Sequence, residues 1–298
     1  MNMKKNNIYV VLGFDVETDV GSWTPFYRSL EKGTRFLLDL SKRKRIEATF
    51  FFTGESAEKF PEKTREVIRA GHEVGCHSLY HETIGDAIFP IPGVKPLLPE
   101  EIPFRLKKAT EVVAKAAGVK MLSFRAPRLW GSTAMVNALE ELGYLADASY
   151  PLFYYRKQLF PYHPNRNNWL EKGKSKILEI PCFADITQKS GDRYGRDLDQ
   201  WPIFRTKGAA VLIKMVDNFV KHLPDRDKTP VVCFYFHPWE FVSQPKKFHF
   251  GEGTVIPDSF IVKNCGQKAL KELERFITGL KKTYDADFLT CRQLTEIQ

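Results

Sequence analysis

Short apolar runs alternate along the chain with longer segments in which apolar and polar residues recur at helical spacing. The apolar runs predict buried strands, and the uninterrupted run Val231–Phe236 is typical of a strand that is covered on both faces. The strands predicted in this way are Tyr9–Asp15, Ala48–Thr53, Glu73–His77, Leu122–Ala126, Ala146–Ser149, Ile177–Pro181, Val231–His237 and, near the end of the chain, Asp287–Thr290.

The segments between these runs predict helices. They are Pro25–Arg43, Ala57–Ala70, Pro99–Ala117, Thr133–Leu142, Lys207–His222 and Gln267–Tyr284. Gly71, Gly118 and Gly143 directly follow three of them, at the position where a helix end favours glycine. Strands that alternate with helices through short connections predict an α/β fold, with a parallel sheet closed or wound over helices.

The length of 298 residues suits a single α/β barrel, which commonly has about 250 residues. We therefore expect one domain over residues 1–298, with long loops at about 150–175 and 238–260. Pro151–Gly173 is rich in aromatic residues, proline and asparagine, and we expect it near the functional rim. The sequence has no apolar run of about 20 residues, so no membrane-spanning helix is predicted.

The start of the chain has two features of a signal peptide. Met1–Asn7 is basic and Ile8–Phe14 is apolar, but the apolar run is short, and acidic residues follow where a cleavage site should lie. We interpret Ile8–Phe14 as a buried strand and expect a cytoplasmic protein. The five cysteines include no C-x-x-C pair, which favours reduced thiols over a disulfide framework.

The formal net charge is +9. Such a charge suits an anionic partner, and it also suits a lysine-rich surface in contact with water. The basic residues are spread along the chain, and no zinc-finger or RNA-binding signature accompanies them. A nucleic-acid partner is therefore not expected.

Ionisable residues lie in, or at the end of, five of the predicted strands. Asp15 closes the first strand, His77 the third and His237 the last apolar run, while Arg125 and Asp147 lie in two strands between them. In α/β barrels and open sheets the ends of parallel strands face the functional site. Packing alone does not explain five such residues at these positions.

Two segments around these positions have the residue types and spacing of a metal site. Alternate residues of an extended chain share a face, so Asp15, Glu17 and Asp19 point the same way and repel one another unless a cation or protons intervene. His77 and His81 are four residues apart, a spacing that places both on one face of a helical turn. Two imidazoles with one carboxylate, leaving open positions for water and substrate, are typical of a catalytic zinc or a related ion.

The other polar and aromatic candidates fit around such a centre. A buried Arg125 needs a carboxylate partner, either in the site or in a structural salt bridge. Asp147 and His237 are suited to form a pair in which the acid orients the imidazole and raises its pKa. Trp130 and Trp239 are candidates for stacking on a sugar ring, with core packing as the alternative for each.

Taken in order, these segments resemble the five motifs of the polysaccharide deacetylase family, the NodB-homology domain of carbohydrate esterase family four. The carboxylate motif is similar to Phe14–Glu17, the H-[ST]-x-x-H motif with its glycine-rich lead-in to Gly71–His81, and the R-x-P motif to Phe124–Pro127. Asp147 and His237 match the last two motifs. The resemblance covers most of the chain and implies a distorted (β/α) barrel of seven or eight parallel strands surrounded by helices.

The resemblance also implies one divalent metal ion, most often zinc, with cobalt or nickel as alternatives. In the family the first motif has adjacent aspartates, one acting as base and one as metal ligand. Here Val16 separates Asp15 from Glu17. By position Asp15 is assigned as the base and Glu17 as the ligand beside the two histidines, while Asp19 is an alternative ligand and the two roles are open to exchange.

The activity implied is hydrolysis of the N-acetyl amide of an amino sugar, which releases acetate. Arg125 would hold the base, and His237, braced by Asp147, would protonate the departing amine. The expected substrate is an N-acetylated sugar or oligosaccharide, free or linked to phosphate or lipid. The alternatives are a cyclic-imide or ureide hydrolase, a deformylase of a lipid-linked amino sugar, or a non-catalytic protein that binds glycan or nucleic acid.

Overall fold

A sheet of parallel strands forms the centre of the molecule in the computed structural model, which describes residues 6–251 and 253–298. The basic start Met1–Lys5 lies outside the described residues. The strands of this sheet are β1 (Asn7–Val16), β2 (Thr49–Phe52), β3 (Glu73–Cys76), β4 (Ser123–Phe124), β5 (Ala146–Asp147), β8 (Leu178–Glu179), β9 (Val231–Phe236) and β12 (Asp285–Leu289).

The strand order is β12-β1-β2-β3-β4-β5-β8, and β9 pairs with the other edge of β1. The long strand β1 has room for three partners, because its first half pairs with β12 and its second half with β2, while β9 runs along its opposite edge. A bridge from Cys182 to Cys233 joins the segment after β8 to β9. The sheet therefore curls into a distorted barrel, which confirms the predicted fold class.

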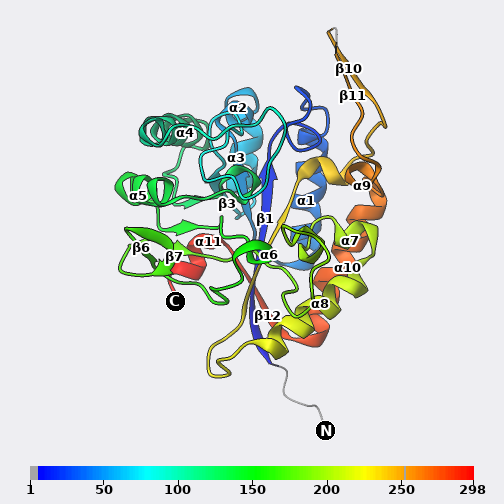
Figure 1. The fold of residues 1–298 in the computed structure, drawn as a ribbon. Coiled ribbons are helices and arrows are strands. Elements are labelled where there is room, and N and C mark those ends of the chain that lie inside the picture. Colours follow the sequence, from blue (N-terminus) through cyan, green and yellow to red (C-terminus); the bar gives the residue numbers. More distant parts are fainter. Residues whose placement is uncertain (1–5, 252) are drawn as a thin grey trace.

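Helices surround this barrel, with α1, α8 and α10 on one side of β1 and α4 and α5 on the other (Figure 1). None of the helices in the described ranges is long and apolar enough to cross a bilayer. The principal helices are α1 (Leu30–Lys44), α2 (Gly54–Lys59), α3 (Pro61–Arg69), α4 (Ile102–Ala117), α5 (Thr133–Leu142), α8 (Ala209–His222) and α10 (Gln267–Thr283); the shorter ones are α6 (Leu152–Tyr155), α7 (Ile203–Thr206), α9 (Ser259–Val262) and α11 (Cys291–Thr295).

Most predicted elements occur within a few residues of their predicted bounds. The helix expected over Ala57–Ala70 is instead two helices, because the chain bends at Phe60 and Pro61 begins α3. The three glycines predicted to end helices all have left-handed backbones, with φ of 85° at Gly71, 75° at Gly118 and 80° at Gly143. A glycine adopts this conformation without the steric cost of a Cβ atom.

The two long loops contain structure of their own. The first holds α6 and the hairpin of β6 (Pro164–Asn165) and β7 (Asn168–Lys172), which packs on the start of α5 through Trp169. The second begins with the 3₁₀ turn Pro238–Phe241, labelled η4, and continues into the hairpin of β10 (Phe248–Phe250) and β11 (Gly253–Val255). That hairpin projects from one end of the molecule (Figure 1).

The interior of the barrel holds a charged group. The Arg125 guanidinium lies 4.4 Å from the centre of the Phe51 ring. A Cβ atom on Gly13 would lie 2.0 Å from Arg125 Nη1, and one on Gly75 would lie 2.6 Å from the Phe51 ring. Strands β1 and β3 therefore need glycine at these positions, because the barrel interior is filled by the arginine and by the ring beneath it.

Candidate active site and metal centre

The ionisable residues identified in the sequence gather at the carboxyl ends of the parallel strands. Asp15 lies near the end of β1, with Glu17 directly beyond it, and His77 and His237 follow β3 and β9. These four residues and His81 line a pocket of about 290 Å³. The parallel register brings together residues that are up to 222 positions apart, as the strand-end argument predicts.

Glu17, His77 and His81 form a cluster whose ligand atoms all lie within 4.8 Å of one another. Glu17 Oε2 is 2.5 Å from His81 Nε2 and 3.7 Å from His77 Nε2. His77 Nδ1 lies 2.7 Å from the carbonyl oxygen of Arg125, which can only accept a hydrogen bond. That bond places the ring proton on Nδ1 and leaves the Nε2 lone pair facing the cluster.

This cluster fits a divalent cation. Glu17 Oε1 and His81 Nδ1 are buried and have no hydrogen-bond partner among the described residues. Burial alone would raise the pKa of Glu17, but the three nearby histidines outweigh burial and lower it well below its usual value. Burial also lowers the pKa of His81, which favours the neutral imidazole. An anionic carboxylate beside neutral imidazoles is a donor set for zinc and related ions.

Asp19, the alternative ligand, points away from this cluster. Its Oδ1 accepts a hydrogen bond of 3.2 Å from the backbone N–H of Ser29, and its backbone carbonyl accepts one of 2.7 Å from the Thr24 hydroxyl. Only 1% of Asp19 is exposed. Asp19 thus fixes the loop that follows β1, and the structure places Glu17 beside the two histidines.

Asp15 lies against the arginine that fills the barrel. Arg125 Nη1 donates to Asp15 Oδ1 at 2.9 Å, and the side chain of Arg125 is fully buried. Its Nε and Nη2 donate to the carbonyls of Ala148 and Phe234 at 3.1 and 3.4 Å. A guanidinium tied to several strands is rigid, so it fixes the position of the Asp15 carboxylate.

His237 is oriented by a carboxylate from its own turn. Glu240 Oε1 lies 3.0 Å from His237 Nδ1 and also accepts a 3.0 Å bond from the backbone N–H of His237. On the far side of the carboxylate, Arg205 Nε donates to Glu240 Oε2 at 2.5 Å, and neither side chain of this ion pair is exposed. Arg205 also donates to the backbone carbonyls of residues 260, 261 and 263.

These contacts determine the protonation of His237. Burial lowers the pKa of the ring, but the hydrogen bond that the ring donates to Glu240 and the charges of Glu17, Glu240 and Asp15 raise it above the usual value. Burial raises the pKa of Glu240 as well, yet Arg205 and His237 outweigh burial and lower it. Glu240 is therefore anionic, and it favours the protonated imidazole.

The predicted pair of Asp147 and His237 is wrong. Asp147 accepts a 2.5 Å hydrogen bond from Ser149 and lies beside Glu179, its partner in the register of β5 and β8. Burial raises the pKa of Asp147 and Glu179, and repulsion between the two carboxyls raises the pKa of Glu179 further. The register therefore places Asp147 in a separate polar cluster, and it is not among the residues that line the pocket.

Of the two tryptophans predicted to contact substrate, only one lines the pocket. Trp130 is fully buried with its ring 5.2 Å from that of Phe89, and it does not line the pocket, so the prediction for Trp130 is wrong. Trp239 does line the pocket and stacks on His237, with ring centroids 5.2 Å apart. Trp201, which the sequence analysis did not single out, lies edge-on to His237 at 5.9 Å.

The sequence analysis also missed Glu240 and two arginines of the pocket wall. The spacing of three residues from His237 to Glu240 within one turn is a signal that could have identified the orienting carboxylate. Arg128 follows the R-x-P motif by one residue, and Arg196 lies in a loop without a motif. No sequence pattern indicates that these two arginines meet in one pocket.

Residues 2–146 match the model of a protein family described as polysaccharide deacetylase. The matched segment is just under half of the chain, and over it the chain resembles the polysaccharide deacetylase family. The matched segment includes Asp15, Glu17, both histidines of the cluster and Arg125, and it ends before Asp147. The turn that holds His237 and Glu240 lies beyond it.

A peptidoglycan-N-acetylglucosamine deacetylase of Bacillus cereus is 27% identical to this chain over an alignment of 146 residues, which covers 40% of this chain and 50% of the relative. A peptidoglycan deacetylase of Helicobacter pylori is 36% identical over 88 residues, 25% of this chain and 30% of the relative. The chain spans half or less of the length of the curated relatives that it matches.

A crystal structure of a putative polysaccharide deacetylase from Mycobacterium smegmatis superposes with a TM-score of 0.62 at 19% identity, over 99% of this chain and 91% of that one. The crystal structure of Puue allantoinase superposes with a TM-score of 0.61 at 16% identity, again over 99% and 91%. Both likenesses concern the fold alone. The fold is therefore shared by a deacetylase-like protein and an allantoinase, and the residues of the site must indicate the chemistry.

Proposed function

We propose that this protein is a divalent-metal-dependent hydrolase that removes the acetyl group from the nitrogen of an amino sugar. The observation that supports this proposal is the arrangement around one pocket of three groups of residues: the cluster of Glu17, His77 and His81, the Asp15–Arg125 pair, and His237 held by Glu240. Amide hydrolysis needs all three functions, namely an electrophile, a base and an acid.

Glu17, His77 and His81 would hold the metal ion. A bound divalent cation polarises the amide carbonyl and lowers the pKa of water, and imidazole ligands favour zinc, with cobalt or nickel as alternatives. Both histidines present Nε2 to Glu17, and the carbonyl of Arg125 holds the His77 ring in that orientation. The ligand set thus depends on strand ends that the barrel itself fixes.

Asp15 is the base in this proposal. It takes the proton of the water that attacks the amide carbonyl, while Arg125, 2.9 Å away, balances its charge and keeps it in place. His237 is the acid. Its raised pKa favours the protonated ring, whose proton passes to the nitrogen as the C–N bond breaks. The products are acetate and a free amine.

An amino sugar is the proposed substrate because the two curated relatives described above are deacetylases of peptidoglycan. The aromatic walls of the pocket, Trp239 and Trp201, suit the apolar face of a sugar ring. The second candidate is a hydrolase of another amide, such as a cyclic ureide, because an allantoinase shares the fold. A protein that only binds glycan or nucleic acid would not need a cluster of two imidazoles and one carboxylate.

The test combines metal analysis with amine release from a panel of N-acetylated sugars and cyclic ureides. We expect one metal ion per chain in the wild-type protein and in Asp15→Asn, which should lose about 10²–10⁴-fold in rate. His77→Ala should lose metal and activity together. His222→Ala, which alters an exposed histidine at the end of α8, is the matched control and should retain both.

Full metal occupancy in His77→Ala would contradict the ligand assignment. Loss of metal in Asp15→Asn, with metal retained in Glu17→Gln, would exchange the roles of the two carboxylates. Turnover of cyclic ureides without turnover of any N-acetylated sugar would favour the second candidate over the first.

A further inference from the structure

Two arginines, Arg128 and Arg196, face the pocket that contains the proposed metal ligands. Much of the remaining wall is apolar, and Trp23, Phe89 and Trp201 are among its rings. Arginine in an otherwise apolar pocket fixes the orientation of a ligand through its charge and its planar set of donors. The question is therefore whether protein carboxylates neutralise both arginines.

Arg196 has such a partner. Its Nη1 lies 3.0 Å from Asp199 Oδ2, and the hydroxyl of Tyr235 donates to the same carboxylate oxygen. The guanidinium also lies over the Phe89 and Phe153 rings, at 5.3 and 4.9 Å from their centres. Arg196 is thus neutralised and held in place within the protein.

Arg128 has only neutral partners. Its Nη1 donates to the carbonyl of His81 at 3.1 Å and to the Thr83 hydroxyl at 3.2 Å. Among the described residues, no carboxylate lies within ion-pair distance of Arg128. Glu17, the carboxylate of the proposed metal cluster, is engaged by His77 and His81. Arg128 therefore faces the pocket without a counter-ion among the described residues.

The backbone conformation at Arg128 also suits a functional role for its side chain. Arg128 and Leu129 both have left-handed backbones, with φ of 62° and 58°. Such a conformation costs a non-glycine residue about 1–3 kcal/mol, and it persists where the surrounding structure requires it. The hydrogen bonds from Nη1 to His81 and Thr83 need only one nitrogen of the guanidinium, and Nε and Nη2 have no acceptor among the described residues.

We propose that Arg128 binds an acidic group of the substrate, a carboxylate or a phosphate, so that the protein prefers N-acetylated amino sugars that carry one. This inference rests on the proposed function and narrows its substrate class. A planar guanidinium whose Nε and Nη2 are free binds either anion through paired, charge-assisted hydrogen bonds. Because Arg128 also contacts the backbone of His81, the acidic group would lie beside the proposed metal ligands.

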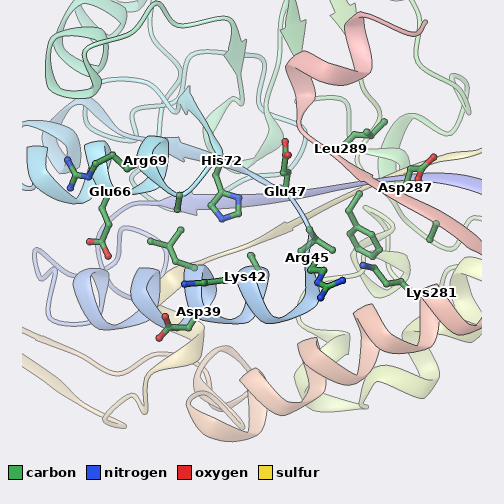
Figure 2. A pocket seen from close by; sticks show the side chains of 16 residues that line it. Asp39, Lys42, Arg45, Glu47, Glu66, Arg69, His72, Lys281, Asp287 and Leu289 are labelled. Carbon is green, nitrogen blue, oxygen red and sulfur yellow. The ribbon is translucent and has the colours of Figure 1, made fainter.

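A second hollow, larger than this pocket, is lined by charged residues of both signs. Its volume is about 870 Å³, and it lies beside β12 and the starts of β2 and β3, at the opposite end of the strands from the site. Its wall holds Asp39, Glu47, Glu66 and Asp287 together with Lys42, Arg45, Arg69 and Lys281 (Figure 2). None of the proposed metal ligands lines this hollow, so the acidic group of the substrate is assigned to the smaller pocket.

The experiment compares three substrates that share one amide: N-acetylglucosamine, its 6-phosphate, and N-acetylmuramic acid, which carries a carboxylate. For the metal-loaded wild-type protein we expect kcat/KM to be higher for at least one acidic sugar than for the neutral one, and the two acidic sugars distinguish phosphate from carboxylate. In Arg128→Gln the ratio of acidic to neutral should fall by about 10- to 100-fold.

Two further variants separate charge from folding. Arg128→Lys retains the charge and should recover part of the preference, whereas a purely structural role would leave the ratio unchanged in both variants. Arg166→Gln removes an exposed arginine of the hairpin of β6 and β7 and should leave the ratio at its wild-type value. The metal content of each variant shows whether the loop around His81 is intact.

Calorimetric titration of the same sugars provides a readout that does not depend on turnover. Binding of an acidic sugar at least tenfold tighter than the neutral one in wild type, and equal binding in Arg128→Gln, would support the inference. Equal affinities in wild type would overturn it, even if all three sugars were hydrolysed. Absence of hydrolysis with a retained acidic preference would instead refute the proposed function and leave the anion site in place.

Discussion

Replacement of Glu240 by glutamine tests which carboxylate controls His237. The substitution keeps the size of the side chain but removes its charge. In the structure both carboxylate oxygens face donors only: Oε1 faces the backbone N–H and Nδ1 of His237, and Oε2 faces Arg205. The amide NH₂ of glutamine must therefore face a donor on one side, whichever way it is turned.

The expected magnitude follows from these distances. A unit charge 3.0 Å from the imidazole is worth about 5 kcal/mol at an effective dielectric constant of about 20, and the opposing charge of Arg205 reduces the net effect. Without this charge the pKa of His237 falls. Since the acid acts in its protonated form, the alkaline limb of kcat/KM moves to lower pH, and the rate on that limb falls by about 10- to 100-fold.

The substitution should also affect stability. Removing one partner of a buried ion pair costs about 3–5 kcal/mol. Arg205 keeps three backbone carbonyls as acceptors, and the glutamine keeps one hydrogen bond. We therefore expect a smaller loss of about 2–3 kcal/mol and a Tm that falls by several degrees.

The assay is the pH profile of kcat/KM for Glu240→Gln and Asp147→Asn beside wild type. Glu140→Gln is the matched control, because Glu140 also pairs with an arginine but lies on α5, outside the pocket lining. Only Glu240→Gln should shift the alkaline limb. A shift in Asp147→Asn, with none in Glu240→Gln, would refute the assignment and restore the pair predicted from the sequence.

Two further predictions concern groups within and beside the barrel. Gly13→Ala adds a Cβ atom 2.0 Å from Arg125 Nη1, so the guanidinium must move away from Asp15. We expect the rate to fall by about 10²-fold or more. Gly191→Ala, in an open loop, is the control and should be neutral. In Glu179→Gln the stability measured by urea unfolding should depend less on pH above about 4, the usual pKa of both carboxyls. Burial raises the pKa of Asp147 to about 6, and the pKa of Glu179 is raised as well. This pair therefore favours the folded state most at acid pH and loses that contribution as the pH rises. An unchanged pH dependence in the variant would contradict the coupling.

The sequence by itself determined the fold class and the candidates for the proposed metal cluster, although it left open which of Asp15, Glu17 and Asp19 is the carboxylate ligand. Apolar runs of strand length are visible without any tertiary information, and the glycines that end helices mark where each helix stops. The strand-end rule then assigns the residues that close parallel strands to one edge of the sheet. For this reason Glu17, His77, His81 and His237 could be placed in one site before the structure was known.

Only the tertiary structure decided which residues contact one another within that site. Asp147 and His237 both belong to motif-bearing strands, yet the register of β5 and β8 pairs Asp147 with Glu179, while the turn after β9 brings Glu240 to the imidazole. Likewise, Trp130 is buried and Arg128 faces the pocket because of two left-handed residues in one turn. Periodicity indicates which face of an element is apolar. It does not determine the distances between side chains of different elements, because these depend on register, rotamer and local backbone conformation, which the whole fold sets together.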